Sequence, residues 1–112
     1  MAKRCWYILV VVLLIPLLAL GQSSELRGKI RDSSGSAVAN AYIELRNQET
    51  GVQLKAKTGR DGEFRVVGIR AGLYQVTVQT DGFKILSRDG IRVKPHEQVQ
   101  LNLILQPSAL AQ

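Results

Sequence analysis

The stretch T-G-R-D-G-E-F-R-V-V-G-I-R-A-G-L-Y-Q-V-T-V, residues 58–78, decides the fold of this chain. Its Asp61-Gly62 pair predicts a turn, because Asp can hydrogen-bond to its own backbone and Gly tolerates positive φ. Residues 63–66 then alternate polar and apolar side chains, and residues 74–79 do so again after a turn marked by Gly68 and Gly72. Alternation with a period of two is typical of half-buried strands. The stretch therefore predicts strand, turn, strand, and it contains no catalytic motif.

The same pattern extends outward in both directions. Further turn pairs occur at Ser34-Gly35, Thr50-Gly51, Asp81-Gly82 and Asp89-Gly90. The alternating runs between them predict seven strands, at residues 26–31, 41–47, 52–58, 63–67, 73–80, 83–94 (broken at Asp89-Gly90) and 98–106. Each run is apolar on one face only, and two stacked antiparallel sheets would bury those faces. The sequence thus predicts an all-β fold, a single seven-stranded antiparallel β-sandwich.

Strand parity also predicts which side chains form the core. Phe64, Tyr74, Phe83 and Ile85 are expected to point inward, whereas Tyr42 is expected to point outward. Tyr74 is further expected to be a corner residue, with a buried ring and a hydroxyl bonded to a turn backbone.

Residues 1–21 predict a secretory signal peptide. Lys3-Arg4 is followed by an unbroken apolar run of 16 residues, and Ala19 and Gly21 place small residues before a cleavage site. The alternative is an uncleaved anchor, although a spanning helix needs about 20 apolar residues. We therefore expect a secreted or periplasmic protein without a membrane span after leader removal, with a polar lead-in at 22–25, the sandwich domain at 26–106 and a tail at 107–112.

Charge and cysteine content narrow the class of protein. The formal net charge is +6, and removal of Lys3 and Arg4 leaves 13 basic (15 less 2) against 9 acidic side chains. This excess suits weak attraction to anionic surfaces. The single cysteine, Cys5, lies in the leader, so the mature domain would contain no disulfide and would depend on its apolar core.

The chain also resembles the carboxypeptidase regulatory-like domain family, a β-sandwich with a transthyretin-like or immunoglobulin-like topology. The matching motifs are G-K-I-R-D (28–32), S-G (34–35), A-Y-I-E-L (41–45), D-G-E-F (61–64), G-L-Y-Q-V-T-V (72–78) and G-F (82–83). This resemblance implies a non-catalytic accessory module, as found in secreted bacterial proteins and at the periplasmic N-terminus of TonB-dependent receptors. It also implies relatives with carbohydrate-binding-like folds.

Residue types that could support catalysis occur singly. His96 is the only histidine and follows Pro95 in an expected loop, so no zinc site can be assembled from His and Cys. The serines lie in a polar tail and a turn without a G-x-S-x-G context. The aspartates fall at turns, where their side chains bond the backbone. The sequence predicts no catalytic, metal or cofactor site, and hence not an enzyme.

The candidate binding residues are outward side chains. Arg27, Lys29 and Arg31 alternate along the first strand. Edge strands expose unpaired backbone groups, so we expect an envelope protein to dock an acidic extended segment on the first or last strand. The simpler alternative is that these charges only prevent aggregation. Nucleic acid is not expected as a partner, because aromatic residues are missing among the outward basic ones.

A carbohydrate-binding module is the alternative function. Sugars stack on exposed aromatic rings, and Tyr42 is the one aromatic residue of the mature chain that parity places outward. A single exposed tyrosine offers a small platform, so Tyr42 is carried forward as a candidate glycan contact beside the three basic residues.

Overall fold

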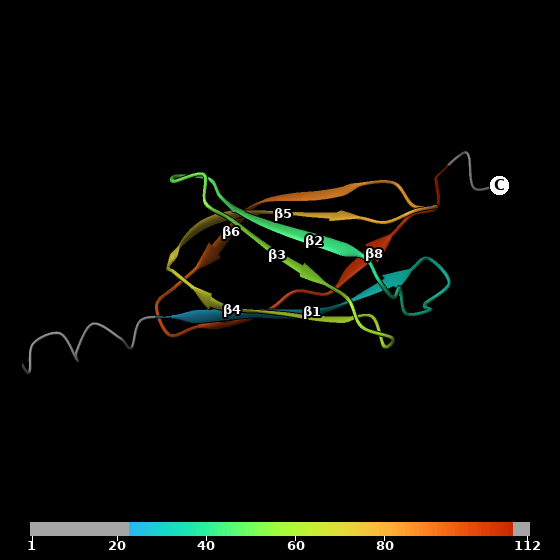
Figure 1. Ribbon diagram of the computed structural model, residues 1–112, viewed down its shortest axis with the longest axis horizontal. Helices are drawn as coiled ribbons and strands as arrows, with labels where there is room; N and C mark the ends of the chain where they lie inside the picture. The colour runs from blue at the N-terminus through green and yellow to red at the C-terminus, as the bar shows by residue number, and fades with distance from the viewer. Residues whose placement is uncertain (1–22, 109–112) are drawn as a thin grey trace, which may run out of the picture.

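The computed structural model describes residues 23–108, which form two four-stranded β-sheets stacked as a sandwich (Figure 1). The all-β sandwich prediction is confirmed. The strands are β1 (Ser24–Asp32), β2 (Tyr42–Asn47), β3 (Gln53–Lys57), β4 (Glu63–Ile69), β5 (Gly72–Gln79), β6 (Leu86–Val93), β7 (Gln98–Gln100) and β8 (Leu103–Leu105). The predicted leader, residues 1–21, lies outside the described residues.

One sheet has β1 at its centre. β4 pairs with β1 antiparallel on one side, and β7 and β8 pair with it in parallel on the other. The second sheet has the order β3-β2-β5-β6 and is antiparallel throughout. Two expectations are corrected here. The first strand is central and not an edge, and the sandwich is not purely antiparallel.

The Asp61-Gly62 turn forms as its residues predict and also joins β4 to β1. Gly62 has a φ of 78°, and its carbonyl accepts a hydrogen bond from the Ile30 N–H at 2.8 Å. A Cβ on Gly62 would lie 2.5 Å from the Ile30 carbonyl oxygen, so the position requires glycine. The Asp61 carboxylate accepts from the Glu63 N–H at 3.0 Å. This turn therefore fixes where β4 begins beside β1.

The core lies between the sheets and follows the predicted alternation. Its buried apolar side chains are Leu26, Ile30, Val38, Ala41, Ile43, Leu45, Phe64, Val66, Ile69, Tyr74, Val76, Val78, Val93, Leu103 and Leu105. Tyr74 is the predicted corner residue: its ring is buried and its hydroxyl donates to the Arg70 carbonyl at 2.7 Å. Phe83 packs against this core as a partly buried residue.

The structure differs from the predicted strands where the backbone is irregular. The last predicted strand is divided into β7 and β8 at Leu101-Asn102, which gives eight strands. The predicted break at Asp89-Gly90 is a bulge within a continuous β6, where the pairing with β5 shifts register. Gly68, which the sequence pattern assigns with Gly72 to the turn before β5, is instead a bulge residue of β4.

Ile85 was expected to be buried, but it is 62% exposed. It lies just before β6, in a segment that pairs irregularly with the C-terminal end of the described chain through Lys84 and Gln106. Strand parity fails at Ile85 because this residue is outside a regular strand. Within residues 23–108, no helix is long and apolar enough to span a membrane.

Candidate functional site

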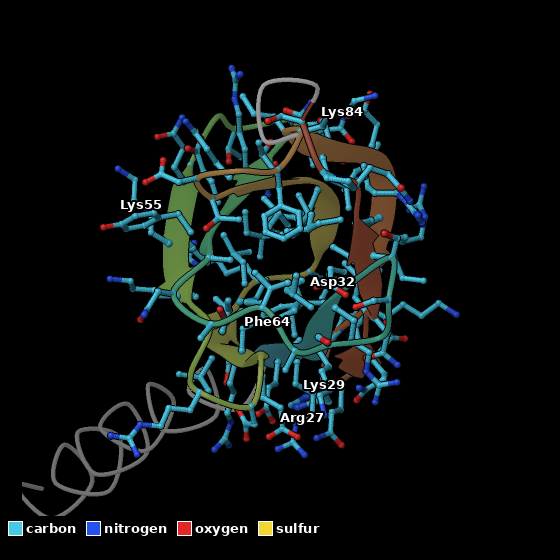
Figure 2. All side chains as sticks on the ribbon, turned by 90° about the vertical axis from the view of Figure 1, so that its right-hand side faces the viewer. Arg27, Lys29, Asp32, Lys55, Phe64 and Lys84 are labelled. Carbon is cyan, nitrogen blue, oxygen red and sulfur yellow. The ribbon has the colours of Figure 1, made fainter. Side chains whose placement is uncertain are left out.

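The three basic residues predicted on the first strand lie together in a groove. Arg27, Lys29 and Arg31 alternate with buried residues of β1 and therefore share its outer face. Figure 2 shows Arg27 and Lys29 pointing away from the sandwich, whereas Phe64 lies between its layers. The groove has a volume of about 680 Å³ and is lined by Arg27, Gly28, Lys29, Arg31, Glu63, Phe64, Arg65, Gln100, Asn102, Leu103 and Ile104. We call it the basic groove.

Ion pairs hold one end of the outer face. The Glu25 carboxylate pairs with Arg27 at 3.1 Å and also with Arg65 of β4. Loss of hydration acts to raise the pKa of the Glu25 carboxyl, but the hydrogen bonds from Arg65 and Arg27 outweigh it and leave that pKa below its ordinary value. Glu25 therefore stays ionised and ties β4 to β1 across the face.

The other end of the basic groove keeps its positive charge. Within the described residues, Lys29 and Arg31 form no ion pair. Glu63 lies opposite Lys29 in the β1–β4 register, so Lys29 has a carboxylate near it without a salt bridge. Arg31 lies beyond the paired part of β4 and is exposed. Arg31 is therefore the cation of the groove that is most available to a ligand.

Asn102 completes the groove where β7 gives way to β8. Its side-chain oxygen accepts from the Lys29 backbone N–H and from the Gln100 amide, both at 3.1 Å. Between the β1–β7 and β1–β8 pairings, the Asn102 side chain thus takes the place of a backbone carbonyl as the acceptor for the Lys29 N–H. Lys29 and Asn102 line this outer groove together, in agreement with the predicted outward direction of Lys29.

Sequence reasoning did not identify Glu63, Arg65, Gln100 and Asn102 as parts of a site. Alternation along residues 63–66 does place Arg65 outward. However, the meeting of these side chains with Arg27 depends on β1 lying between β4 and β7, and no local pattern in the sequence determines that order.

Tyr42 is not part of the basic groove. It lies on β2 in the other sheet and is 62% exposed, as parity predicts. The Lys57 ammonium is 5.0 Å from the centroid of its ring, a cation–π contact across the β2–β3 pair. That contact occupies part of the ring surface that a sugar would need.

Two of the turn aspartates, Asp32 and Asp61, bond to their own loops, whereas the Asp89 carboxylate accepts from the Gln75 side-chain amide at 2.8 Å. The Asp32 carboxylate accepts from the Ser34 hydroxyl and from the Ser34 and Ser36 N–H groups. The Ser34 hydroxyl, more than any other group, lowers the pKa of Asp32, and the Glu63 N–H does the same for Asp61. Within the described chain, His, Cys, Asp and Glu form no group of three or more that could hold a metal ion. His96 lies in the turn between β6 and β7.

Comparison with known proteins identifies a matching family and a shared fold. The family model of the carboxypeptidase regulatory-like domain matches residues 25–106. No curated protein sequence matches the chain.

Several solved structures share the fold. Catechol 1,2-dioxygenase from Acinetobacter sp. ADP1 superposes with a TM-score of 0.64 at 14% identity, over 82% of this chain and 55% of that one. Chlorocatechol 1,2-dioxygenase from Pseudomonas putida gives 0.58 at 15%, over 76% and 60%. A Bacteroides uniformis protein described as carbohydrate binding gives 0.63 at 20%, over 75% and 41%. The chain spans less than two thirds of each, and at these identities the likeness shows the fold alone.

Proposed function

The chain belongs to the carboxypeptidase regulatory-like domain family, and from this membership we propose that it is a non-catalytic module that docks a protein partner in the cell envelope. The family is a regulatory-like one, which supports an accessory role over a catalytic one. The observation that carries the proposal is the free edge of β7 beside the basic groove.

The free edge follows from the pairing of β7. The Glu97 carbonyl accepts from the Glu25 N–H at 2.9 Å, and the Leu101 N–H donates to the Arg27 carbonyl at 2.8 Å. Residues 97 and 101 therefore direct backbone groups toward β1. Because backbone direction alternates along a strand, Gln98 and Gln100 direct their N–H and C=O groups to the opposite side. Among the described strands, none pairs with that side of β7.

An edge of this kind can bind an extended segment of another protein. The added strand would gain backbone hydrogen bonds from β7, and the side chains on the outer face would select its sequence. The short length of β7 and its interruption at Leu101-Asn102 limit uncontrolled pairing with further copies. The edge thus supports docking of a specific partner.

We expect Gln100→Pro to weaken partner binding about tenfold, because it removes a hydrogen-bond donor that only an added strand would use. Photocrosslinking from position 98 in cells, followed by mass spectrometry, measures this. The yield of the crosslinked envelope protein should fall strongly with Gln100→Pro and much less with Gln100→Ala, which loses the side-chain amide but keeps the N–H.

Lys55→Pro is the matched control at another edge. Thr58 and Asn47 bond across the β2–β3 pair, and alternation therefore directs the Lys55 N–H away from β2. This variant should leave the crosslink unchanged. Equal crosslinking of the wild type and Gln100→Pro would contradict docking at the β7 edge.

The envelope setting is a further part of the proposal and rests on the leader pattern of residues 1–21. We expect the exported protein to begin at Gln22 and to contain neither tryptophan nor cysteine, because Trp6 and Cys5 leave with the leader. Intact-mass measurement of the protein from a periplasmic fraction checks this. A membrane-bound product that retains residues 1–21 would support the anchor instead.

A second candidate function is glycan binding at Tyr42. Glycan binding is favoured by the exposure of the Tyr42 ring and by the fold shared with a protein described as carbohydrate binding. Two observations favour protein docking over glycan binding: the Lys57 contact, and the lack of a second fully exposed aromatic side chain among residues 23–108. Glycan-array binding that is lost with Tyr42→Ala would reverse this preference.

A further inference from the structure

We infer that the docked strand is acidic, with carboxylates at alternating positions that the basic groove binds. This inference rests on the proposed docking at the β7 edge and specifies the chemistry of the partner. It starts from the distribution of charge on the outer face. Four cations, Arg27, Lys29, Arg31 and Arg65, share this face with two carboxylates, Glu25 and Glu63, and the Asp61 carboxylate of the neighbouring turn also attracts Lys29.

The spacing of the cations matches that of an extended peptide. Same-face residues of a strand are separated by about 6.6 Å, twice the rise per residue. Arg27, Lys29 and Arg31 follow one another at this interval along β1. A partner strand that pairs with β7 runs alongside β1 with the same repeat. Carboxylates at every second position of the partner would therefore keep step with the three cations.

The cations are also within reach of such a strand. A strand added beyond β7 would lie two interstrand spacings from β1, about 9.6 Å. Arg27 already extends toward β7. With the side-chain amide of Gln98 oriented so that its oxygen faces Arg27, this oxygen accepts a hydrogen bond from the Arg27 Nε at 2.9 Å. A long carboxylate side chain on the added strand can meet an extended guanidinium across the remaining distance, and Gln100, exposed on the same face, would supply a further donor.

An acidic peptide fits these observations better than an acidic polysaccharide. Both would use the cations and the amide side chains of the groove. Only a peptide would also pair with the backbone groups that Gln98 and Gln100 direct to the free side of β7. The lack of aromatic side chains on this face, apart from the buried Phe64, also removes the stacking surface that sugar rings use.

The test uses the protein purified from the cell envelope and short fluorescent peptides in an anisotropy titration. The probe alternates Glu and Thr, and its controls alternate Gln and Thr, or Glu and Pro. We expect the Glu–Thr peptide to bind at least about tenfold more tightly than the Gln–Thr peptide, with an affinity that falls as salt is added. The Glu–Pro peptide, in which every second residue lacks an N–H and the rings favour a polyproline II backbone over a paired strand, should bind at least about tenfold more weakly than the Glu–Thr peptide.

Arg31→Glu should reduce binding of the Glu–Thr peptide by about tenfold or more, and Lys55→Glu, the same charge reversal on the other sheet, should not. Arg31 is preferred to Lys29 for this test, because a glutamate at position 29 would face Glu63 in the β1–β4 register. Arg31→Gln is a milder second variant, and circular dichroism confirms that each variant is folded.

The outcomes separate this inference from the function on which it rests. Equal binding of the Glu–Thr and Gln–Thr peptides would overturn the acidic preference but leave edge docking intact. Equal binding of the Glu–Thr and Glu–Pro peptides would overturn strand addition itself. Tighter binding of oligogalacturonate than of the Glu–Thr peptide, lost with Arg31→Glu, would reassign the groove to acidic polysaccharides. Failure of every peptide to bind would overturn the inference, while the crosslinking from position 98 would still decide the proposed function.

Discussion

Gly28→Ala should destabilise the domain by about 3 kcal/mol or more, at or above the upper end of the usual range for overpacking. Gly28 is a buried residue of β1, at the point where β7 gives way to β8. A Cβ at this position would lie 1.7 Å from the Leu101 carbonyl oxygen and 2.9 Å from the Phe64 ring. The ring could move, but the carbonyl belongs to a chain held to β1 by hydrogen bonds. Relief would therefore require β7 and β8 to separate from β1.

The denaturant midpoint measures this effect, and Gly59→Ala is the matched control. A Cβ on Gly59 would meet only the Asp61 carboxylate at 3.4 Å, an ordinary contact. This variant should stay within about 0.5 kcal/mol of the wild type. Equal midpoints for Gly28→Ala and the wild type would mean that the Leu101 carbonyl does not approach β1 as the structure describes.

Strand positions and core residues could be predicted because both depend on local pattern. The polar–apolar alternation of residues 63–66 places Phe64 and Val66 inward, and the structure buries both. The Tyr74 corner was also predictable, because its ring follows a turn whose carbonyls need donors. In a regular strand, successive side chains point to opposite faces of the sheet. The apolar residues of a period-two pattern are therefore the ones that the core buries.

The order of strands was not predictable, because it is set by contacts between residues far apart in sequence. Nothing near residues 24–32 indicates that β4 lies on one side of β1 and β7 on the other. The central place of β1 turns a predicted edge into the floor of the basic groove. The same order moves the free edge to β7 and brings Arg65, Gln100 and Asn102 beside the predicted cations.

The break at Leu101-Asn102 links stability to the candidate site. It follows from Gly28, whose missing side chain admits the Leu101 carbonyl. It also turns Asn102 toward the Lys29 N–H and into the groove. The short, interrupted strands that result leave β7 with a free edge only three residues long. One glycine in the core thus shapes the surface proposed for docking.

Phe64→Ala should destabilise the domain by about 3–5 kcal/mol, the usual cost of removing a buried phenylalanine. Phe64 is 4% exposed and pairs across the β1–β4 ladder with Gly28. Its ring covers the backbone that the glycine leaves bare, an arrangement known to stabilise glycine in sheets. Truncation would open a cavity against β1, and neither the Gly28 backbone nor the Leu101 carbonyl can fill it. A small domain has about 5–15 kcal/mol of stability in total, so this loss is a large fraction of it.

Val67→Ala on the same strand is the control for this truncation. Val67 is 60% exposed at the β4 bulge, so truncation of its side chain removes little buried apolar surface. The variant should lower the free energy of unfolding by less than about 0.5 kcal/mol. Phe64→Leu, which keeps most of the volume, should lie between the two. Chemical denaturation of the three variants gives the order directly. Comparable midpoints for Phe64→Ala and Val67→Ala would show that the inward face of β4 is wrongly assigned, and with it the outward direction of Arg65 into the basic groove.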